Sequence, residues 1–548
     1  MADGVAQNRY AFWLGSGISI DRMPRLNKLA LIILDYLQKR ADPADSNCRF
    51  HKSLVEIMSL ALSTDERAGI DIAKEVKDWP DAAGIADRLT LHYARMLDLS
   101  PDGQEDDFLV WDALGVVGVF ADPSKDPDVE HLCLAALILE GVASDIASAN
   151  WDGLVEKAVE RLSGGAPTLR VWVRSEDARQ APLKADIYKF HGCAVLAGAY
   201  ETEYRGKIIA RQTQINGWAA RAENAVIVAK LTELVSTRPT LMLGLSVQDS
   251  NIQGVFVAAE QRMQWPWPSH PPAYVFSEDA LGIDQQGLLR NVYRDTYTPA
   301  TRQTIYDAAL LRAYAKPLLT ALWLFVIAAK IGALIEHAPG SLAPADKIAL
   351  REGVEALRSA VAATSNAVGI ETFVNGSLLR SRRIMSLFRE GQEPQAATPG
   401  YLAVSAIPVQ QIAGDPMLSS SGMREFSIAL GLLGLMVKSD ALTMRAGDPL
   451  RAASKSLHVK GAADEVPLYF AANGQSALKL VVNGVVSDDH DAIVVHSHHV
   501  PARKTRSPRA ERGRVGRLGL REVSIAELLE SASAAPDLLQ RFREKVAL

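Results

Sequence analysis

The sequence predicts an α/β protein in which residues 1–300 form a doubly wound, mostly parallel sheet. Short apolar runs typical of buried strands alternate with helical patterns along this part of the chain. Ligands of open parallel sheets bind where strands end in loops. Four of the apolar runs end in short segments of small and polar residues, namely LGSGIS (Leu14–Ser19), SANWD (Ser148–Asp152), KFHG (Lys189–Gly192) and LGLSVQDSN (Leu243–Asn251).

The expected elements follow in chain order. A first strand and a glycine turn occupy residues 9–19, and a helix is expected to begin near Pro24, since proline is tolerated in a first helical turn. Helical patterns at 153–162 and 222–235 separate later strands, as a parallel sheet requires. Those strands are expected at about 142–148, 186–190, 240–245 and 273–276.

Residues 30–135 interrupt this alternation and are expected to form a helical insertion. Apolar residues such as Leu54, Ile57 and Met58 recur there at helical spacing, and the segment is too long for a simple crossover. Residues 301–340 are expected to close the domain with apolar helices. Their longest apolar run, Pro317–Ala329, stops at Lys330, so we expect a buried helix and no membrane span.

Residues 341–548 are expected to form a mixed α+β C-terminal domain with a role in assembly or regulation. Helical patterns at 350–361 and 423–437 precede a strand-like stretch from 466 to 495, in which Asn483-Gly484 is a turn signal. A basic segment, Arg503–Arg521, follows. It is either a solvated loop or a surface for nucleic acid or an acidic protein, and the end of the chain again has a helical pattern.

Composition narrows the class of protein. A hydrophobic content of 48% and a net charge of −5 predict a soluble globular protein that does not coat nucleic acid. The three cysteines are far apart, so we expect no disulfides and a cytoplasmic location. A histidine-rich stretch near the C-terminus lacks a supporting carboxylate or cysteine pattern, so no metal site is predicted. Its members are His490, His496, His498 and His499.

Each of the four segments has a chemical and a purely structural interpretation. In the last of them, Ser246 is suited to contact a phosphate or ribose oxygen, or it lies in a turn before a capped helix. Glycines in Gly15–Ser19 let backbone amides approach a phosphate, although glycine turns are common punctuation, and the spacing differs from that of dehydrogenases. Asn150 and Asp152 are able to hold a water or a ribose hydroxyl, or to cap the following helix. His191 is suited to act as a general base, with Gly192 leaving room for a substrate, or is a buried core histidine.

Taken in order, the segments resemble the NAD-binding motifs of sirtuins, and more closely those of sirtuin-like NAD-consuming proteins of bacterial antiphage defence. The sirtuin pattern is GAGIS, T-x-N-x-D, HG, and G-x-S followed by an acidic residue; this chain has GSGIS, SANWD, HG and GLSVQD. The resemblance implies a sirtuin-like, Rossmann-type sheet over residues 1–300. It also implies site roles: Gly15, Ser16, Gly17 and Ser19 for NAD phosphates; Asn150 and Asp152 for the nicotinamide ribose and a water; His191 as catalytic base; and Gly244, Ser246 and Asp249 for the rest of NAD, with Gly244 and Ser246 on the adenosine side.

The departures from the sirtuin pattern are also informative. Sirtuin deacylases carry a CxxC…CxxC zinc module, which Cys48, Cys133 and Cys193 cannot form, so no zinc is expected. Ala149 stands where glutamine is typical, and Arg25-Leu26-Asn27 stands where Asp-Phe-Arg is typical. Because the zinc module helps to frame an acyl-lysine peptide, its loss disfavours deacylation.

The resemblance therefore implies an NAD⁺ hydrolase that depletes NAD as the effector of an antiphage, abortive-infection system. Such a toxic activity is expected to be triggered by a partner, such as a HerA-type ATPase or a short Argonaute, and the chain is expected to form a homo-oligomer. No Walker A segment is present, so an ATPase would be a separate protein. The alternatives are an NAD-dependent protein deacylase and a non-catalytic nucleotide-binding scaffold, against which Asn150 and His191 argue.

Overall fold

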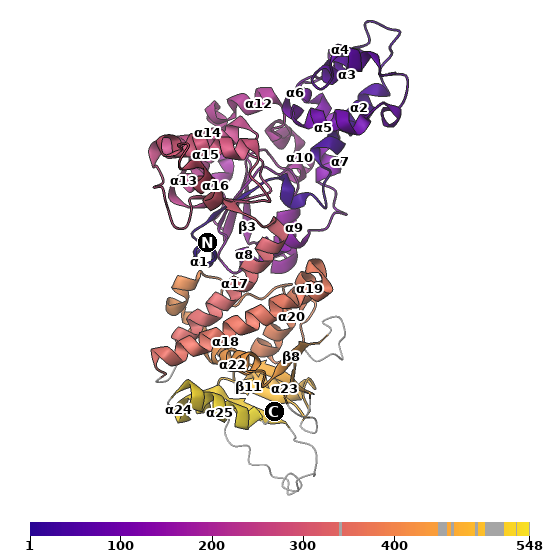
Figure 1. The fold of residues 1–548 in the computed structure, drawn as a ribbon. Helices are drawn as coiled ribbons and strands as arrows, with labels where there is room; N and C mark the ends of the chain where they lie inside the picture. Colours follow the sequence, from indigo (N-terminus) through magenta and orange to yellow (C-terminus); the bar gives the residue numbers. More distant parts are fainter. Residues whose placement is uncertain are drawn as a thin grey trace.

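The protein is described by a computed structural model and is elongated (Figure 1). The central α/β part lies between a helical insertion at one end and the C-terminal region at the other. The structure describes residues 1–338, 342–447, 457–461, 465–487, 491–498, 520–532 and 534–546.

A seven-stranded sheet with only parallel pairings forms the centre of the N-terminal part, which confirms the predicted fold class. Its order is β3-β4-β2-β1-β5-β6-β7. Two of these strands, β3 and β7, were not predicted, because β3 is not fully buried and β7 has only two residues. The strands are β1 (Ala11–Leu14), β2 (Asp145–Ser148), β3 (Leu169–Trp172), β4 (Ala185–Lys189), β5 (Thr240–Leu243), β6 (Tyr274–Ser277) and β7 (Leu310–Leu311).

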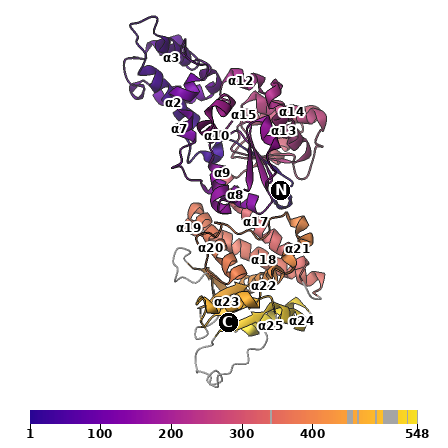
Figure 2. The same cartoon turned by 180° about the vertical axis from the view of Figure 1, so that it is seen from behind.

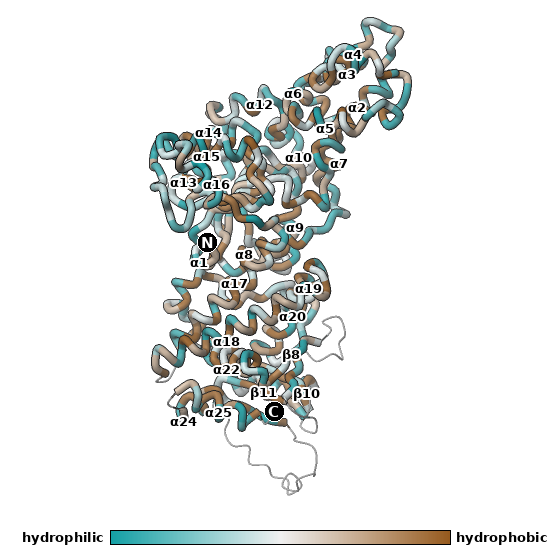
Figure 3. The backbone as a smooth tube through the Cα atoms, viewed as in Figure 1, coloured by the Kyte–Doolittle hydropathy of each residue, from teal (hydrophilic) through white to brown (hydrophobic). Residues whose placement is uncertain are grey.

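Helices cover both faces of this sheet (Figures 1 and 2). Phe12 and Leu14 of β1 face one hydrophobic core, whereas Ala11 and Trp13 face the other, as the two-residue period of a strand requires. Both faces of the sheet are therefore buried away from water, and hydrophobic residues lie along the strands (Figure 3). The first face packs on α8 (Val129–Leu139), α9 (Leu154–Ser163) and α17 (Ala315–Glu336), and the second on α13 (Ala225–Thr237), α14 (Ser250–Arg262) and α15 (Ile283–Tyr293).

The register of the sheet places four strand ends at one edge. Leu14 of β1 pairs with Ser148 of β2 and with Leu243 of β5. Ser148 pairs in turn with Lys189 of β4. Because the strands are parallel, the four loops that follow them begin side by side at the carboxyl edge, close to where the strand order reverses.

The expected insertion is helical and has a hydrophobic core of its own, which continues into the sheet domain at Val173 and Cys193. Its predicted end at residue 135 is wrong, because residues 129–135 begin α8, which packs on the sheet. Some of its side chains therefore reach the carboxyl edge of the sheet. Its helices include α2 (Leu26–Gln38), α3 (Arg49–Ser59), α5 (Ala82–Thr90), α6 (Tyr93–Met96) and α7 (Val116–Phe120).

Helix α17 joins the two halves of the protein. Among the described residues it alone is long and apolar enough to cross a membrane, but 67% of its apolar window is buried inside the protein, as in a core helix. Lys330, at which the apolar run stops, does not end the helix, because this buried lysine bonds the Glu140 carboxylate (2.7 Å) and the Ser405 carbonyl (2.5 Å). The helix therefore continues to Glu336.

The C-terminal region is mixed α+β, as predicted. Helices α18 (Pro344–Ala363), α20 (Ile370–Glu390) and α22 (Met423–Lys438) lie between α17 and a second sheet, of order β12-β11-β10-β9-β8 (Figure 1). Strands β10–β12 are parallel, and β8 and β9 are antiparallel additions. The strands are β8 (Thr443–Ala446), β9 (Leu457–Lys460), β10 (Glu465–Ala471), β11 (Ile493–His496) and β12 (Arg521–Ser524).

The strand-like stretch predicted between residues 466 and 495 is wrong in its middle, whereas the turn predicted at Asn483-Gly484 forms. Helix α23 (Gly474–Val482) connects β10 to β11, and Asn483 follows it as a C-cap. Asn473 starts the helix by accepting a hydrogen bond from the amide of Ser476. The basic segment Arg503–Arg521 falls outside the described residues except at its last two positions, and His490 and His499 are also outside them.

Candidate active site

A cavity of about 420 Å³ opens at the carboxyl edge of the seven-stranded sheet. Its volume lies within the range of about 300–1,000 Å³ typical of small-molecule and cofactor sites. The four loops that follow β1, β2, β4 and β5 all contribute to its wall. Every predicted site residue lines it: Gly15, Ser16, Gly17, Ser19, Asn150, Asp152, His191, Gly244, Ser246 and Asp249.

Three of these glycines allow two loops to touch. A Cβ atom on Gly17 would lie 2.5 Å from the Cα of Gly244, and Gly244 itself has a positive φ of +58°. The amides of Gly15 and Gly17 donate to the carbonyls of Leu243 and Gly244, both at 3.0 Å. The glycines therefore build the floor of the cavity, and two of their amides are already used within it.

Gly192 also serves the packing of the chain. It has a φ of +95°, and a Cβ there would lie 2.4 Å from the carbonyl oxygen of Lys207. The expectation that this glycine leaves room for a substrate is wrong. Its missing side chain makes room for a neighbouring loop, which holds the backbone beside His191 in place.

Asn150 is buried, and its amide is anchored on one side. Its Nδ2 donates to Ser19 Oγ at 3.4 Å, and its backbone amide donates to Ser148 Oγ at 3.2 Å. Its Oδ1 is buried without a hydrogen-bond partner among the described residues. An unpaired buried carbonyl oxygen is costly, so Oδ1 is an acceptor that a ligand hydroxyl or a water would satisfy.

His191 has the geometry of a neutral base. Asn251 Oδ1 accepts from the amide of Ile252 at 2.9 Å, which orients Nδ2 of the same side chain toward His191 Nε2, also at 2.9 Å. Nε2 therefore accepts a hydrogen bond and is unprotonated in the neutral ring. Burial lowers the pKa of His191, although the carboxylate of Asp249, 3.7 Å away, and Asn251 act in the opposite direction.

The helical insertion supplies a wall that was not predicted. Tyr93 of α6 donates a hydrogen bond to Asp249 Oδ1, while Asp249 Oδ2 faces His191. Burial, followed by the charge of Asp249, raises the pKa of Tyr93 well above its usual value, so this hydroxyl remains a donor. Phe120 of α7 lines the same cavity and packs edge to face on Trp151 at 5.2 Å.

The cavity contains more acidic than basic side chains. Asp87, Asp152 and Asp249 line it, and among its lining residues in the described part of the chain only Arg25 is an arginine or lysine. Arg25 was noted in the sequence as a departure from a motif and not as a site residue. Asp152 Oδ1 also accepts from the amide of Leu154 at 3.1 Å, so its structural role at the start of α9 holds as well.

Potential metal ligands do not gather here. Across the described residues, no three histidine, cysteine, aspartate or glutamate side chains lie close enough to hold a metal ion. Cys133 and Cys193 are buried and Cys48 is partly exposed, and all three are free.

Part of the sheet domain matches a known protein family. Residues 144–296 match the family model described as the SIR2-like domain. The chain carries a sirtuin-like domain. Three of the four predicted segments lie within the match, and the first, Leu14–Ser19, begins at the end of the central strand of the same sheet. Sirtuin-like domains use NAD, and no curated protein matched the chain.

Proposed function

We propose that the protein is an NAD⁺ hydrolase that cleaves the bond between nicotinamide and ribose. The observation that carries the proposal is the meeting of two groups in one cavity of a sirtuin-like domain. These groups are the unpaired Oδ1 of Asn150 and the unprotonated Nε2 of His191. The first is an acceptor for a water or hydroxyl, and the second is a base.

The cavity offers partners for the phosphates and for an aromatic ring of NAD. Because the amides of Gly15 and Gly17 already bond the carbonyls of Leu243 and Gly244, we assign the phosphates to the hydroxyls of Ser16 and Ser19 and to the guanidinium of Arg25. The apolar part of the wall, which includes Phe120, suits an aromatic ring.

The acidic side chains suit the chemistry of hydrolysis. The transition state carries positive charge on the ribose as nicotinamide leaves, and the carboxylates of Asp152 and Asp249 favour such charge. A water oxygen forms a bond to the anomeric carbon, the carbon–nitrogen bond breaks, and its electron pair leaves with nicotinamide. His191 accepts the proton lost by the water at Nε2, whose lone pair becomes available when the Asn251 amide breaks its hydrogen bond to that atom. Asn150 Oδ1 accepts a hydrogen bond from the same water and orients it.

The products formed by the purified full chain test this proposal. We expect NAD alone to yield nicotinamide and ADP-ribose in equal amounts. An acetyl-lysine peptide should leave that yield unchanged. Nicotinamide release that requires the peptide would indicate a deacylase, and NAD binding with no product under any condition would indicate a scaffold. Either result would overturn the proposal.

We also propose that the activity serves antiphage defence in the cytoplasm as an abortive-infection effector. The motif resemblance and the toxicity of NAD loss support this role, and a partner such as a HerA-type ATPase or a short Argonaute would trigger the activity of the homo-oligomer. We expect bacteria that express the chain with its neighbouring genes to lose NAD after phage infection. Cells carrying Asn150→Ala should keep their NAD and should not be protected. Equal protection by both proteins would contradict the proposed role.

A further inference from the structure

His131 is a fully buried histidine that touches the proposed site from behind. It lies in the first turn of α8, where Asp128 caps the helix by accepting from the amide of Val129 at 2.7 Å. The Nδ1 atom of His131 accepts from the backbone amide of Asp128 at 3.1 Å. A backbone amide is only a donor, so Nδ1 carries no proton.

The second ring nitrogen of His131 therefore acts as a donor. Burial lowers the pKa of His131, so the ring is neutral at pH 7 and its one proton lies on Nε2. Nε2 is 3.1 Å from Ser19 Oγ, to which it donates. The same oxygen also accepts from Asn150 Nδ2.

These two donors fix the orientation of Asn150. A serine hydroxyl accepts two hydrogen bonds, so His131 and Asn150 together occupy both acceptor positions of Ser19. The hydrogen of Ser19 is left for an acceptor in the cavity. Because Nδ2 of Asn150 is held on Ser19, its unpaired Oδ1 is held away from Ser19.

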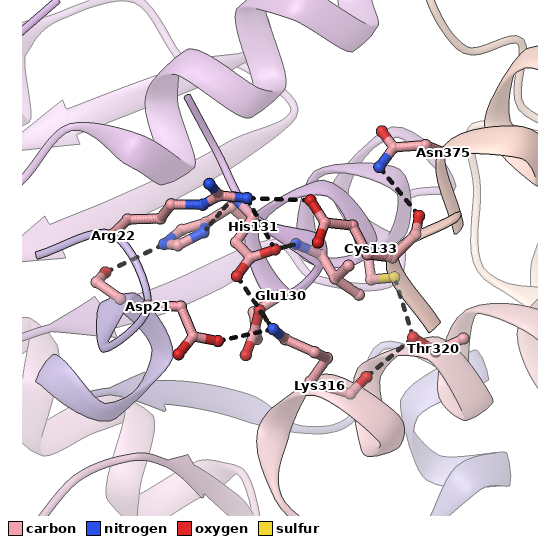
Figure 4. Close-up of polar contacts among 12 residues, drawn as sticks. Asp21, Arg22, Glu130, His131, Cys133, Lys316, Thr320 and Asn375 are labelled. Atoms are coloured by element: carbon pink, nitrogen blue, oxygen red, sulfur yellow. Dashed lines mark hydrogen bonds and ion pairs between the residues drawn. The ribbon is translucent and has the colours of Figure 1, made fainter. Parts of the chain in front are cut away.

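The hydrogen bonds that run from Asp128 through His131 and Ser19 to Asn150 form a relay. Ion pairs hold its Asp128 end in place (Figure 4). Lys316 Nζ lies 3.1 Å from Asp128 Oδ2 and 2.8 Å from Asp21 Oδ2, and Arg22 lies 3.4 Å from Asp128 Oδ1. Arg22 also meets Glu371 of α20 at 3.2 Å, but the Glu371 side chain is 63% exposed. Exposed pairs contribute about 0–1 kcal/mol, so the contact of Lys316 with Asp128, which is only 4% exposed, is the stronger link.

Helix α17 connects Lys316 to the C-terminal region. Leu319 and Leu322, near its start, pack in the core of the seven-stranded sheet. Ile331, Leu334 and Ile335, near its end, pack in the C-terminal core. A continuous helix of 22 residues is a stiff connection. A shift of the C-terminal core would therefore change the position of Lys316.

We propose that His131 is a positioning residue for NAD cleavage, and that Lys316 of α17 holds it in place through Asp128. The inference rests on the proposed function. In this arrangement His131 never touches NAD; it keeps Ser19 and Asn150 in the orientation that cleavage needs. The relay also gives the C-terminal region a physical path to the site.

The first test separates positioning from folding. His131→Phe removes both ring nitrogens, His131→Gln restores an N–H donor near the place of Nε2, and Cys133→Ala is a control on the same buried helix, directed at Thr320 and away from Ser19. We expect His131→Phe to lower the single-turnover rate of nicotinamide release by about 10- to 100-fold. NAD affinity, measured by calorimetry, should change by less than about threefold, and His131→Gln should recover most of the rate.

The second test addresses the link to α17. Lys316→Met should slow release and should add nothing to His131→Phe, because both act through one relay. Lys347→Met is the matched control, since Lys347 bonds the Glu336 carbonyl at the far end of α17, and it should leave the rate unchanged.

The outcomes distinguish the two proposals. Two results with an active wild type would overturn the relay alone. One is that His131→Phe releases nicotinamide no more slowly than Cys133→Ala. The other is that the effects of Lys316→Met and His131→Phe on this rate are additive. A wild type that binds NAD but releases no nicotinamide under any condition would overturn the proposed function, and the relay with it.

Discussion

Gly244→Ala should destabilise the protein because two loops meet where the new methyl group would lie. A Cβ on Gly244 would be 2.5 Å from Gly17 Cα and 2.7 Å from Gly17 C, distances that real Cβ atoms do not show. Overpacking of this kind costs about 1–3 kcal/mol. The left-handed backbone at φ +58° adds about 1–2 kcal/mol for an alanine. We therefore expect a loss of about 2–5 kcal/mol, or about 4–20 °C in melting temperature.

Two other glycines separate these contributions. Gly115 has a φ of +64° with nothing within 4 Å of its Cβ position, so Gly115→Ala reports the backbone cost alone. Gly254 is helical with nothing within 4 Å, so its alanine variant should melt at or above the wild-type temperature. Tryptophan fluorescence during heating measures all three variants. If Gly244→Ala melts together with Gly115→Ala, the contact with Gly17 carries no energy and the account of the cavity floor is refuted.

Three further predictions concern stability, pH and metal content. Lys330→Met should lower the free energy of unfolding by about 3–5 kcal/mol, because it leaves the buried carboxylate of Glu140 without its cation. The second substitution Glu140→Gln should restore part of this loss. Equal melting temperatures of the wild type and Lys330→Met would contradict the prediction. Burial raises the pKa of Glu130 from 4.5 to about 7, so the stability it contributes is complete below pH 4.5 and is lost as the pH rises through 7. The free energy of unfolding of Glu130→Gln, measured by denaturant titration, should therefore rise relative to that of the wild type by up to about 3 kcal/mol between about pH 5 and pH 8. A difference that does not change with pH would contradict this prediction. Elemental analysis should find far less than one zinc per chain, and a stoichiometric amount would count against the zinc-free interpretation of the three cysteines.

The sheet and the ring of predicted site residues were accessible from the sequence for a definite reason. Strands such as β1 and β5 are buried on both faces and appear as uninterrupted apolar runs, and each run ends at a loop of small or polar residues. In a parallel sheet the register then brings these loops together without further information. Asn150 and His191 were therefore placed correctly in one cavity.

Other contributors depend on packing that no short pattern records. Tyr93 reaches the site only because the insertion folds over the carboxyl edge, and His131 only because α8 begins behind Ser19. Gly192 was misinterpreted because the chain that excludes its side chain, at Lys207, is 15 residues away. Helix α23 was predicted as strand, since its apolar run fits either structure and its cap was overlooked.

Nicotinamide release at saturating NAD is the measurement that tests the central claim most directly. Wild-type protein, Asn150→Ala and His191→Ala should all bind NAD in calorimetry, because neither side chain carries the phosphates in this account. Both variants should lose at least about 100-fold in the rate of nicotinamide release, as expected when a base or its partner is removed. Wild-type rates in both variants, with NAD bound, would contradict the assignment of this cavity as the site of NAD cleavage.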